Sequence, residues 1–331
     1  MFKNSIPVDN FFGNYLKFLR SNHGLSQREL SVKLNLSSEE LAHVDFVAVS
    51  RWERGIIIPS ARRQVNILRT LTNDISPYIM MLAKASPVNM RDSQIENFIN
   101  FRYKSPVALI NNVSYRDEHA SASIVKEIRF DDKEVILDIC NFHYQLCSKL
   151  ISNQQLSEYI KSNRVIGFKH IKEDGTLVGH KVFILWGENV LEKEINRLLN
   201  DDLSINEINI KLSKPMNNKV PLSCYAVSQY SDDEDTLRAQ LYIEYSMLVK
   251  NVNIHHLYYN VFFDNAMKAM LNLGFNLVKV EGNSSNGKII YNGKKYDRAL
   301  LHINTCNLLL NPEFVCLFSE HKMNSNIQLD L

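Results

Sequence analysis

The chain of 331 residues lacks a long apolar run, because no stretch approaches the roughly 18 uncharged apolar residues that a helix needs to cross a bilayer. Its N-terminal sequence, MFKNSIPVDN, also lacks the apolar core of a secretory signal peptide. With 45% hydrophobic and 22% charged residues, the composition is that of an ordinary globular protein, which argues against disorder. We therefore expect a folded cytoplasmic protein that does not bind membranes.

Cysteine is scarce: the chain has five, an odd and scattered set that favours reduced thiols over a disulfide framework. Cys140, His143 and Cys147 follow a C-x2-H-x3-C spacing that would place all three near one helical face. Leu146 and Leu150 share that face. We therefore interpret the group as part of a buried helix and expect no metal site.

Patterns that carry catalysis are missing as well. The sequence has no phosphate-binding loop, no nucleotide-binding glycine fingerprint and no paired carboxylates, and the pair His255–His256 is a weak signal for a metal. Glu244–Met247 contains a Ser-Met pair similar to that of self-cleaving phage repressors, but no Ala-Gly cleavage pair occurs in the sequence. We interpret Ser246 as an ordinary strand residue. No catalytic residue, no cofactor and no enzymatic activity are predicted.

The stretch from Gly24 to Ser60 carries the most informative pattern. Ser26 precedes Gln27 at the start of an apolar-periodic segment, where its hydroxyl can cap a helix. Further on, Val49 and Trp52 recur at helical spacing before Gly55, a residue type that commonly ends helices. Leu30, Leu34, Val49 and Trp52 are expected in the core. Pro59–Ser60 then begins another helix.

This pattern resembles the helix-turn-helix of the phage Cro and repressor class, also called the xenobiotic-response-element family of bacterial regulators. The resemblance rests on Ser26–Gln27, on Trp52–Glu53–Arg54–Gly55 and on Pro59–Ser60, and it covers roughly residues 8 to 86. It implies a five-helix DNA-binding domain whose recognition helix lies in the major groove.

The spacing departs from the family at one place. The recognition helix would ordinarily begin near Ser37, but Val49 comes too late for that start. We therefore take Asp45 as the cap, place the recognition helix at Asp45–Arg54, and treat Ser37–Val44 as an insertion. Glu39–Glu40 suit the first turn of a helix, so the insertion could form an extra helical turn.

The resemblance implies roles for individual residues. Arg51 matches a base-contacting position and can grip guanine in a bidentate way. Phe46 and Val47 are apolar where polar residues are usual, which favours contacts with thymine methyl groups, and Ser50 could reach a base or a phosphate. For Arg51, the alternative is an ordinary solvated surface arginine.

Other positions match phosphate contacts or structural contacts. Gln27 begins its helix at a phosphate-contacting position, and Ser60, Arg62 and Arg63 begin the next helix and are expected to do the same. The resemblance further implies that Glu53 pairs with Arg20 of the first helix. Residues 1–85 contain eleven Lys and Arg against seven Asp and Glu, a net charge of +4 where the whole chain has +2. The positive excess therefore lies where phosphate contacts are needed.

Beyond residue 86 the sequence favours strands that alternate with helices. Before that point, Ile75–Ala85 is expected to form the fifth helix of the N-terminal domain. The strands expected beyond it are Val107–Tyr115, Ile124–Phe130, Val135–Ile139, Leu237–Val249, Phe275–Val280 and Ala299–Asn304, with a hairpin of Ile166–Ile171 and Val178–Trp186. Helices are expected within Phe142–Lys161 and at Asn189–Leu199 and His256–Leu273. Asn292–Gly293 predicts a tight hairpin turn. Together these predict an α+β domain with a mostly antiparallel sheet.

The order of strand, helix and strand from Leu237 to Val280 resembles the core of N-acetyltransferase folds. Those enzymes hold the cofactor's pyrophosphate in a glycine-rich loop between the central strand and its helix. In this assignment that loop is Lys250–His255, which contains no glycine. Transferase activity is therefore disfavoured.

The sequence thus predicts an all-α helix-turn-helix domain at residues 1–86, a linker at residues 87–92 and an α+β domain at residues 93–331 for dimerisation or ligand sensing. The expected function is that of a transcription regulator that binds double-stranded DNA as a homodimer, with a small molecule or a protein as effector. Two alternatives stay open. One is an antitoxin or immunity protein whose C-terminal domain binds a protein, and the other is a C-terminal enzyme delivered to DNA.

Overall fold

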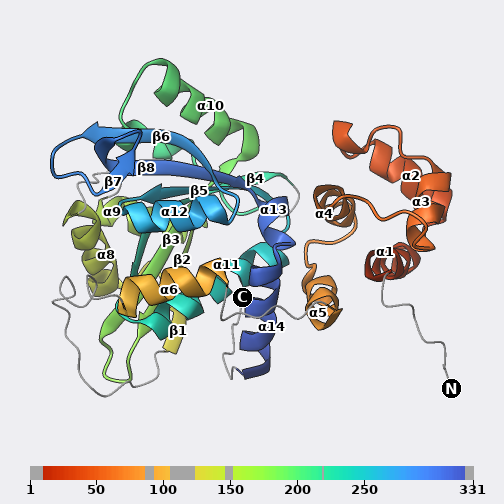
Figure 1. Ribbon diagram of the computed structural model, residues 1–331, viewed down its shortest axis with the longest axis horizontal. Coiled ribbons are helices and arrows are strands. Elements are labelled where there is room, and N and C mark those ends of the chain that lie inside the picture. The colour runs from red at the N-terminus through yellow and green to blue at the C-terminus, as the bar shows by residue number, and fades with distance from the viewer. Residues whose placement is uncertain (1–9, 86–92, 105–123, 146–151, 218–219, 325–331) are drawn as a thin grey trace. The chain divides into compact units, whose positions relative to one another are not determined.

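The computed structural model of the chain describes residues 10–85, 93–104, 124–145, 152–217 and 220–324 (Figure 1). The chain divides into two compact units. Unit 1 consists of Met1–Val88, Tyr245–Asn253 and Thr305–Met323, and unit 2 consists of Asn89–Glu244, Ile254–Asn304 and Asn324–Leu331.

Unit 1 begins with a run of short helices whose starts are set by capping side chains. They are α1 (Phe11–Asn22), α2 (Gln27–Asn35), α3 (Phe46–Glu53), α4 (Ala61–Arg69) and α5 (Ser76–Ala85). Asn10 caps α1, Ser26 caps α2 in a capping box with Glu29, and Asp45 caps α3. Gly24 and Gly55 follow α1 and α3 with φ of 65° and 71°, a conformation that favours glycine. The helices predicted from Ser26, Asp45 and Pro59–Ser60 are therefore confirmed.

Two later segments of the chain complete unit 1. They contain the end of α11 (Glu234–Lys250), α13 (Thr305–Leu309) and α14 (Pro312–Asn324). Tyr245 of α11 is buried; its hydroxyl donates to the carbonyl of Leu309 at 2.6 Å and its ring stacks on Phe314. The amide of Ile75 donates to the carbonyl of Val249 at 3.0 Å, which ties the start of α5 to the end of α11.

The composition of unit 1 differs from the predicted division at residues 86 to 93. Tyr245–Asn253 and Thr305–Met323, which we had placed in the C-terminal domain, belong to unit 1. The physical reason is a set of long-range contacts, such as those of Arg69 on α4. Its guanidinium donates to the carbonyl of Val252 at 2.5 Å and to Thr305 Oγ1 at 2.7 Å. The predicted linker at residues 87–92 lies outside the described residues.

Unit 2 is built around one sheet of eight strands within the described residues. The strands are β1 (Ile124–Glu127), β2 (Val165–Ile171), β3 (Leu177–Gly187), β4 (Leu222–Ser231), β5 (Ile254–Val261), β6 (Asn276–Asn283), β7 (Ile289–Tyr291) and β8 (Lys294–Asn304). Their order is β1-β2-β3-β4-β5-β8-β6, with β7 paired to β8. The paired strands are antiparallel except β4 and β5, which are parallel. The α+β class with a mostly antiparallel sheet is therefore confirmed.

Helices pack against this sheet (Figure 1). The helices of unit 2 include α6 (Gln94–Lys104), α8 (Lys133–Gln145), α9 (Asn153–Lys161), α10 (Glu188–Asn200) and α12 (Asp264–Asn272). Alternate residues of a strand point to the same face, so Val182, Ile184 and Trp186 of β3 all enter the apolar cluster that α8, α9 and α10 cover. Next to them in β3, Lys181 is buried and pairs with Glu244 of α11.

Several predicted elements of unit 2 are confirmed. The hairpin of Ile166–Ile171 with Val178–Trp186 corresponds to β2 and β3, and the helix at Asn189–Leu199 corresponds to α10. Asn292 and Gly293 have φ of 49° and 74°, as a tight hairpin turn with two left-handed residues requires. The predicted strand Val107–Tyr115 lies outside the described residues.

Three predictions are wrong, because apolar runs were assigned to the wrong type of element. Val135–Ile139 lies in α8 and is not a strand, and Leu237–Val249 lies in α11. His256–Leu273 is not one helix, since β5 occupies its first part and α12 its second. The run in α11 is buried around most of the helix and shows no clear periodicity, so residue pattern alone does not separate a buried strand from a buried helix there. In α8 the β-branched, apolar composition of Val135–Ile139 favoured a strand, although Leu137 is 45% exposed. Among the described residues, no helix combines the length and apolarity needed to span a membrane.

Candidate nucleic-acid interface

The α3 helix presents one face of side chains to solvent. Asp45 begins it, with its carboxylate accepting a hydrogen bond from the Ala48 amide at 2.7 Å. Val49 and Trp52 are buried, so the opposite face of α3 is exposed to solvent. That outward face carries the four predicted base-contacting residues: Phe46, 54% exposed, Arg51, also exposed, and the half-buried Val47 and Ser50.

The insertion before α3 is a folded loop with its own anchors. The side chain of Asn35, the last residue of α2, donates to the carbonyl of Val44 at 2.9 Å and accepts from its amide at 2.8 Å. Between Asn35 and Val44, residues Glu39–Leu41 form a turn of 3-10 helix, as the sequence indicated. Leu41 and Val44 are buried. Asn35 therefore joins the two ends of the loop, so that α3 still follows α2 closely despite the extra residues.

Glu53 is the buried centre of contacts between α1, α2 and α3. Arg20 Nε donates to one carboxylate oxygen of Glu53 at 2.5 Å and Arg20 Nη2 donates to the other at 3.1 Å. Gln27 Nε2 also donates to Glu53, at 2.7 Å. The structure thus brings together Arg20 and Glu53, the pair that the sequence suggested. The side chain of Gln27, which the sequence predicts to contact a phosphate, is bound to Glu53.

The remaining residues assigned to phosphate lie at the start of α4. Ser60 is the N-cap residue, and its exposed hydroxyl makes no hydrogen bond to the helix. Arg62 is engaged by an ion pair with Glu40 of the insertion, and Asn66 donates to the same carboxylate. The inserted loop therefore neutralises one of the cations that the sequence assigned to DNA. Sequence reasoning missed Glu40, because only the folded loop brings it to α4.

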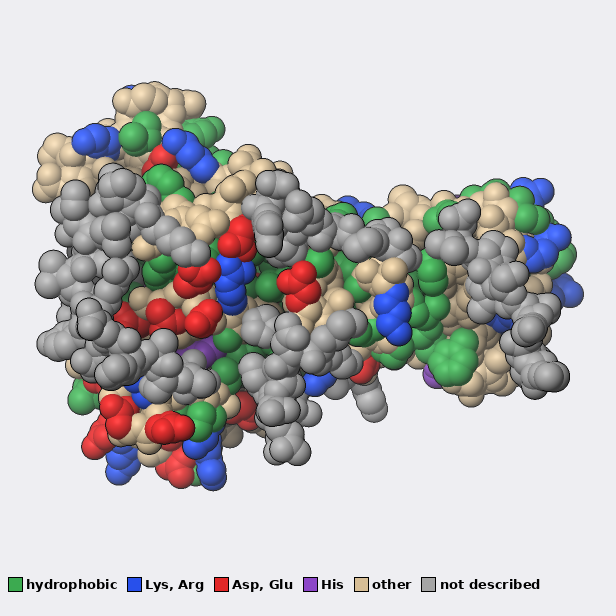
Figure 2. All heavy atoms as spheres, turned by 60° about the horizontal axis from the view of Figure 1, so that its bottom comes forward, with side chains coloured by type: hydrophobic (Ala, Val, Ile, Leu, Met, Phe, Trp, Pro, Cys, Tyr) green, Lys and Arg blue, Asp and Glu red, His purple; other side chains and the backbone are tan. Residues whose placement is uncertain are grey.

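Other cations lie on the described part of unit 1. The Arg63 guanidinium lies 5.7 Å from the centroid of the Trp52 ring, which places it beside α3. Arg28 on α2 and Arg54 at the end of α3 are exposed and form no ion pair with described residues. The sequence signal for these two was their position beside the motif residues Gln27 and Glu53. Figure 2 shows several Lys and Arg side chains (blue) close together on the surface of this part of unit 1.

The metal spacing noted in the sequence does not form a site among the described residues. No group of three His, Cys, Asp or Glu side chains within them is arranged to hold a metal ion. Cys140 and His143 are buried in α8, and Cys147 lies outside the described residues. Burial raises the pKa of the Cys140 thiol to about 11, which keeps it protonated at neutral pH.

No model of a known protein family matches the chain, and no curated protein matches it in sequence. Solved structures of N-acetyltransferases resemble part of it. An N-acetyltransferase from Staphylococcus aureus Mu50 is 12% identical, covers 58% of this chain and 100% of its own, and has a TM-score of 0.34. Spermidine N-acetyltransferase from Vibrio cholerae is 15% identical with coverages of 57% and 97% and a TM-score of 0.34. Arabidopsis thaliana NAA60 in complex with acetyl-CoA is 11% identical, with coverages of 55% and 98% and a TM-score of 0.33.

These comparisons contradict the prediction that the chain is not an enzyme, because the matching solved structures are enzymes, and we withdraw that prediction. At such TM-scores the likeness assigns neither an activity nor a substrate. The comparisons do not test the resemblance of residues 8–86 to the Cro and repressor class.

The structure also corrects the position predicted for a pyrophosphate-binding loop, which the sequence placed at Lys250–His255. Because Leu237–Val249 is helical, the connection between a central strand and its helix is the one from β4 to α11, at Asp232 and Asp233. It contains no glycine, and the Asp233 carboxylate already accepts a hydrogen bond from the Thr236 amide at 2.7 Å. Glu234 and Asp235 add two more carboxylates at the start of α11. A pyrophosphate bound here would meet these carboxylates, so the connection does not fit the pyrophosphate loop that the sequence resemblance implied.

Proposed function

We propose that the chain is a sequence-specific DNA-binding regulator that reads its operator through α3. The observation that carries the proposal is the outward face of α3, where Phe46, Val47, Ser50 and Arg51 are accessible while Val49 and Trp52 anchor the helix. A helix with a capped N-terminus and a protruding arginine suits insertion into the major groove.

The surroundings of α3 support the same function. The contacts of Glu53 with Arg20 and Gln27 hold α1, α2 and α3 together, so the reading face is rigid before DNA is bound. A preorganised surface loses less conformational entropy on binding. Ser60 and Arg63 at the start of α4, together with Arg28 and Arg54, supply polar and cationic groups for phosphates.

We further propose that two copies bind one operator. The net charge of +4 over residues 1–85 is small for one copy, and dimerisation doubles it. Two copies related by twofold symmetry read two half-sites about one helical turn of DNA apart.

Selection of bound sequences from a random pool of double-stranded DNA tests the proposal. The full chain should enrich a palindrome with half-sites about 10 base pairs apart. Enrichment of a single half-site would contradict the dimer, and recovery of an unenriched pool would contradict sequence-specific binding altogether.

Arg51→Ala should relax the base preference at one position of each half-site, because the bidentate contact with guanine is lost. The expected loss of discrimination at that position is about 1–3 kcal/mol, read from binding to operators with single substitutions. Lys17→Ala removes the same charge from an exposed position of α1 and should leave the preference unchanged. An Arg51→Ala variant with unaltered preference would show that α3 does not read bases.

A further inference from the structure

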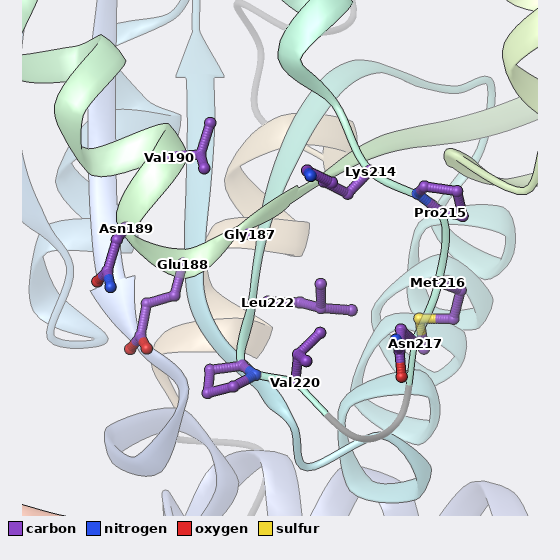
Figure 3. A pocket seen from close by; sticks show the side chains of 11 residues that line it. Gly187, Glu188, Asn189, Val190, Lys214, Pro215, Met216, Asn217, Val220 and Leu222 are labelled. Atoms are coloured by element: carbon purple, nitrogen blue, oxygen red, sulfur yellow. The ribbon is translucent and has the colours of Figure 1, made fainter.

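Unit 2 contains a pocket of about 560 Å³ where β3 ends and α10 begins (Figure 3). It is lined by residues 187–190, 214–217 and 220–222. Pockets of roughly 300–1,000 Å³ with a mostly apolar lining and a few polar groups are typical of small-molecule sites. Here Val190, Met216 and Leu222 provide apolar surface for the body of a ligand.

Glu188, the first residue of α10, is the acidic group of the pocket. Its Oε1 accepts hydrogen bonds from His255 Nδ1 at 3.1 Å and from His256 Nε2 at 3.0 Å. These two contacts hold the pKa of the Glu188 carboxyl far below its usual range. No described residue donates to its Oε2, and the side chain is 27% exposed. The carboxylate is therefore ionised and fixed, and it has one oxygen available.

A third histidine stabilises this arrangement. His302 Nε2 lies 2.8 Å from His256 Nδ1, and burial together with the neighbouring His256 lowers the pKa of His302 to about 4. His302 is therefore neutral at pH 7 and can donate to His256, whose remaining N–H then donates to Glu188. This order of donors fixes the Glu188 carboxylate, and the neutral His302 adds no charge to the group.

The pocket also has a cationic group and a helix start without a side-chain cap; the first helix amide, that of Glu188, donates to the carbonyl of Pro221 at 3.2 Å. Lys214 forms no ion pair with a described residue, and in Figure 3 its nitrogen reaches toward the segment of Gly187 and Val190. Gly187 is the N-cap of α10 and has no side chain to cap the helix amides. A lysine and an uncapped helix start both favour a ligand carboxylate. The lining thus offers one charge of each sign with apolar surface between them.

We propose that this pocket binds a small zwitterion with an apolar body, of the class of apolar amino acids. Its ammonium group donates to Glu188 Oε2, and its carboxylate lies toward Lys214 and the start of α10. Its apolar part packs against Val190, Met216 and Leu222. This site is independent of the proposed DNA binding, because all its residues belong to unit 2.

Three probes with one aromatic body separate the two charges. L-phenylalanine carries both, 2-phenylethylamine lacks the carboxylate, and 3-phenylpropanoate lacks the ammonium group. Their binding to the full chain is measured by isothermal titration calorimetry at pH 7.5. L-phenylalanine should bind at least about tenfold tighter than either of the others, because only it makes both charge-assisted contacts.

Single variants then assign each charge to its partner. Glu188→Gln keeps the shape of the side chain and should weaken L-phenylalanine and 2-phenylethylamine about tenfold, without weakening 3-phenylpropanoate. Lys214→Met should weaken L-phenylalanine and 3-phenylpropanoate and spare 2-phenylethylamine. Met216→Ala should weaken all three, because it removes apolar contact common to them.

Glu192→Gln is the matched control, since Glu192 is exposed one turn further along α10 and does not line the pocket. It should leave the affinities for all three probes unchanged. The proposal is overturned if wild-type protein binds the three probes equally, or if Glu188→Gln and Lys214→Met weaken the same probes. It is also overturned if L-phenylalanine does not bind at all.

Discussion

At the scale of single residues, Glu53 organises unit 1 from a buried position. Its carboxylate receives Arg20 and Gln27, and its backbone carbonyl accepts a hydrogen bond from the side chain of Asn10 at 3.0 Å. The same asparagine accepts a hydrogen bond from the Gly13 amide and so caps α1. Loss of Arg20 would leave the carboxylate of Glu53 buried without its main counter-ion, which is far costlier than loss of an exposed ion pair. Glu53 therefore fixes the helices that flank the reading face.

Glu40→Gln should strengthen DNA binding, because Glu40 is the partner that neutralises Arg62. A released Arg62 is free to contact a phosphate, and repulsion between the carboxylate and the DNA backbone disappears. We expect affinity to rise about 3- to 10-fold near 0.1 M salt, with a plot of log K against log salt steeper by about one unit. Fluorescence anisotropy with a labelled operator at several salt concentrations measures both quantities.

The adjacent Glu39 provides the control for this experiment. It is exposed on the same loop and forms no ion pair with a described residue. Glu39→Gln makes the same change in net charge and should raise affinity much less. Equal gains from both variants would mean that only net charge acts, and an unchanged affinity of Glu40→Gln would exclude Arg62 as a phosphate contact.

At the scale of elements, the insertion depends on the closure made by Asn35. Asn35→Ala removes both hydrogen bonds to Val44, each worth about 0.5–1.5 kcal/mol. The loop should open more often, and amides of the insertion and of the first turn of α3 should exchange hydrogen about 10- to 100-fold faster. Hydrogen exchange followed by mass spectrometry measures this locally.

Two further variants test whether faster exchange comes from loss of the Asn35 hydrogen bonds. Asn35→Asp keeps the acceptor for the Val44 amide but loses the donor, so its exchange rates should lie between those of wild type and Asn35→Ala. Asn22→Ala alters an exposed asparagine at the end of α1 and should leave exchange in α3 unchanged. Unchanged exchange in Asn35→Ala would mean that burial of Leu41 and Val44 alone holds the loop.

The elements that sequence predicted well are those with local signals. Ser26 and Asp45 mark helix starts through their own side chains, and Asn292–Gly293 marks a turn through its backbone preference. Such signals depend on residues within a few positions of one another. For the same reason, the exposed positions of Phe46 and Arg51 followed from the placement of α3.

Elements that depend on distant partners were not predictable in this way. Helix α11 has apolar or buried residues around most of its circumference, so Leu237–Val249 shows no clear helical stripe. Two contacts of the candidate site could not be predicted for the same reason. That Gln27 binds Glu53 and that Arg62 binds Glu40 are facts of folded geometry, with separations of 26 and 22 residues in the chain.

At the scale of the whole molecule, segments far apart in sequence complete unit 1. Arg69 reaches residues 183 to 237 positions away, including Val252, Thr305 and Cys306. Reading the chain in order suggests a head that ends near residue 86, because no local pattern marks Tyr245–Asn253 or Thr305–Met323 as its parts. A fragment of residues 1–88 would lack these contacts, so functional experiments on the head require the full chain.

Unit 2 contains several buried histidines that make its stability depend on pH. Burial lowers the pKa of His143 to about 4, of His170 to about 4 and of His180 to about 3, and neighbouring positive charge and imidazoles contribute for His143 and His180. The ordinary value of 6.5 returns when the chain unfolds. Between pH 6.5 and about 4 the unfolded chain therefore binds more protons than the folded one, and stability falls as pH falls.

The size of this effect gives a final prediction. Each histidine contributes a slope of up to about 1.4 kcal/mol per pH unit, and His302, whose pKa is also lowered to about 4, adds a fourth. The four together give about 5 kcal/mol per unit between pH 6 and 4 and almost none above pH 7. Urea unfolding followed by the fluorescence of Trp186, in a Trp52→Phe background that removes the other tryptophan, measures the slope for unit 2. His180→Gln should reduce it by about one quarter, while His43→Asn, at an exposed position of unit 1, should not change it. A slope that begins only below pH 4.5 would assign the acid sensitivity to carboxylates, because their ordinary pKa values lie there.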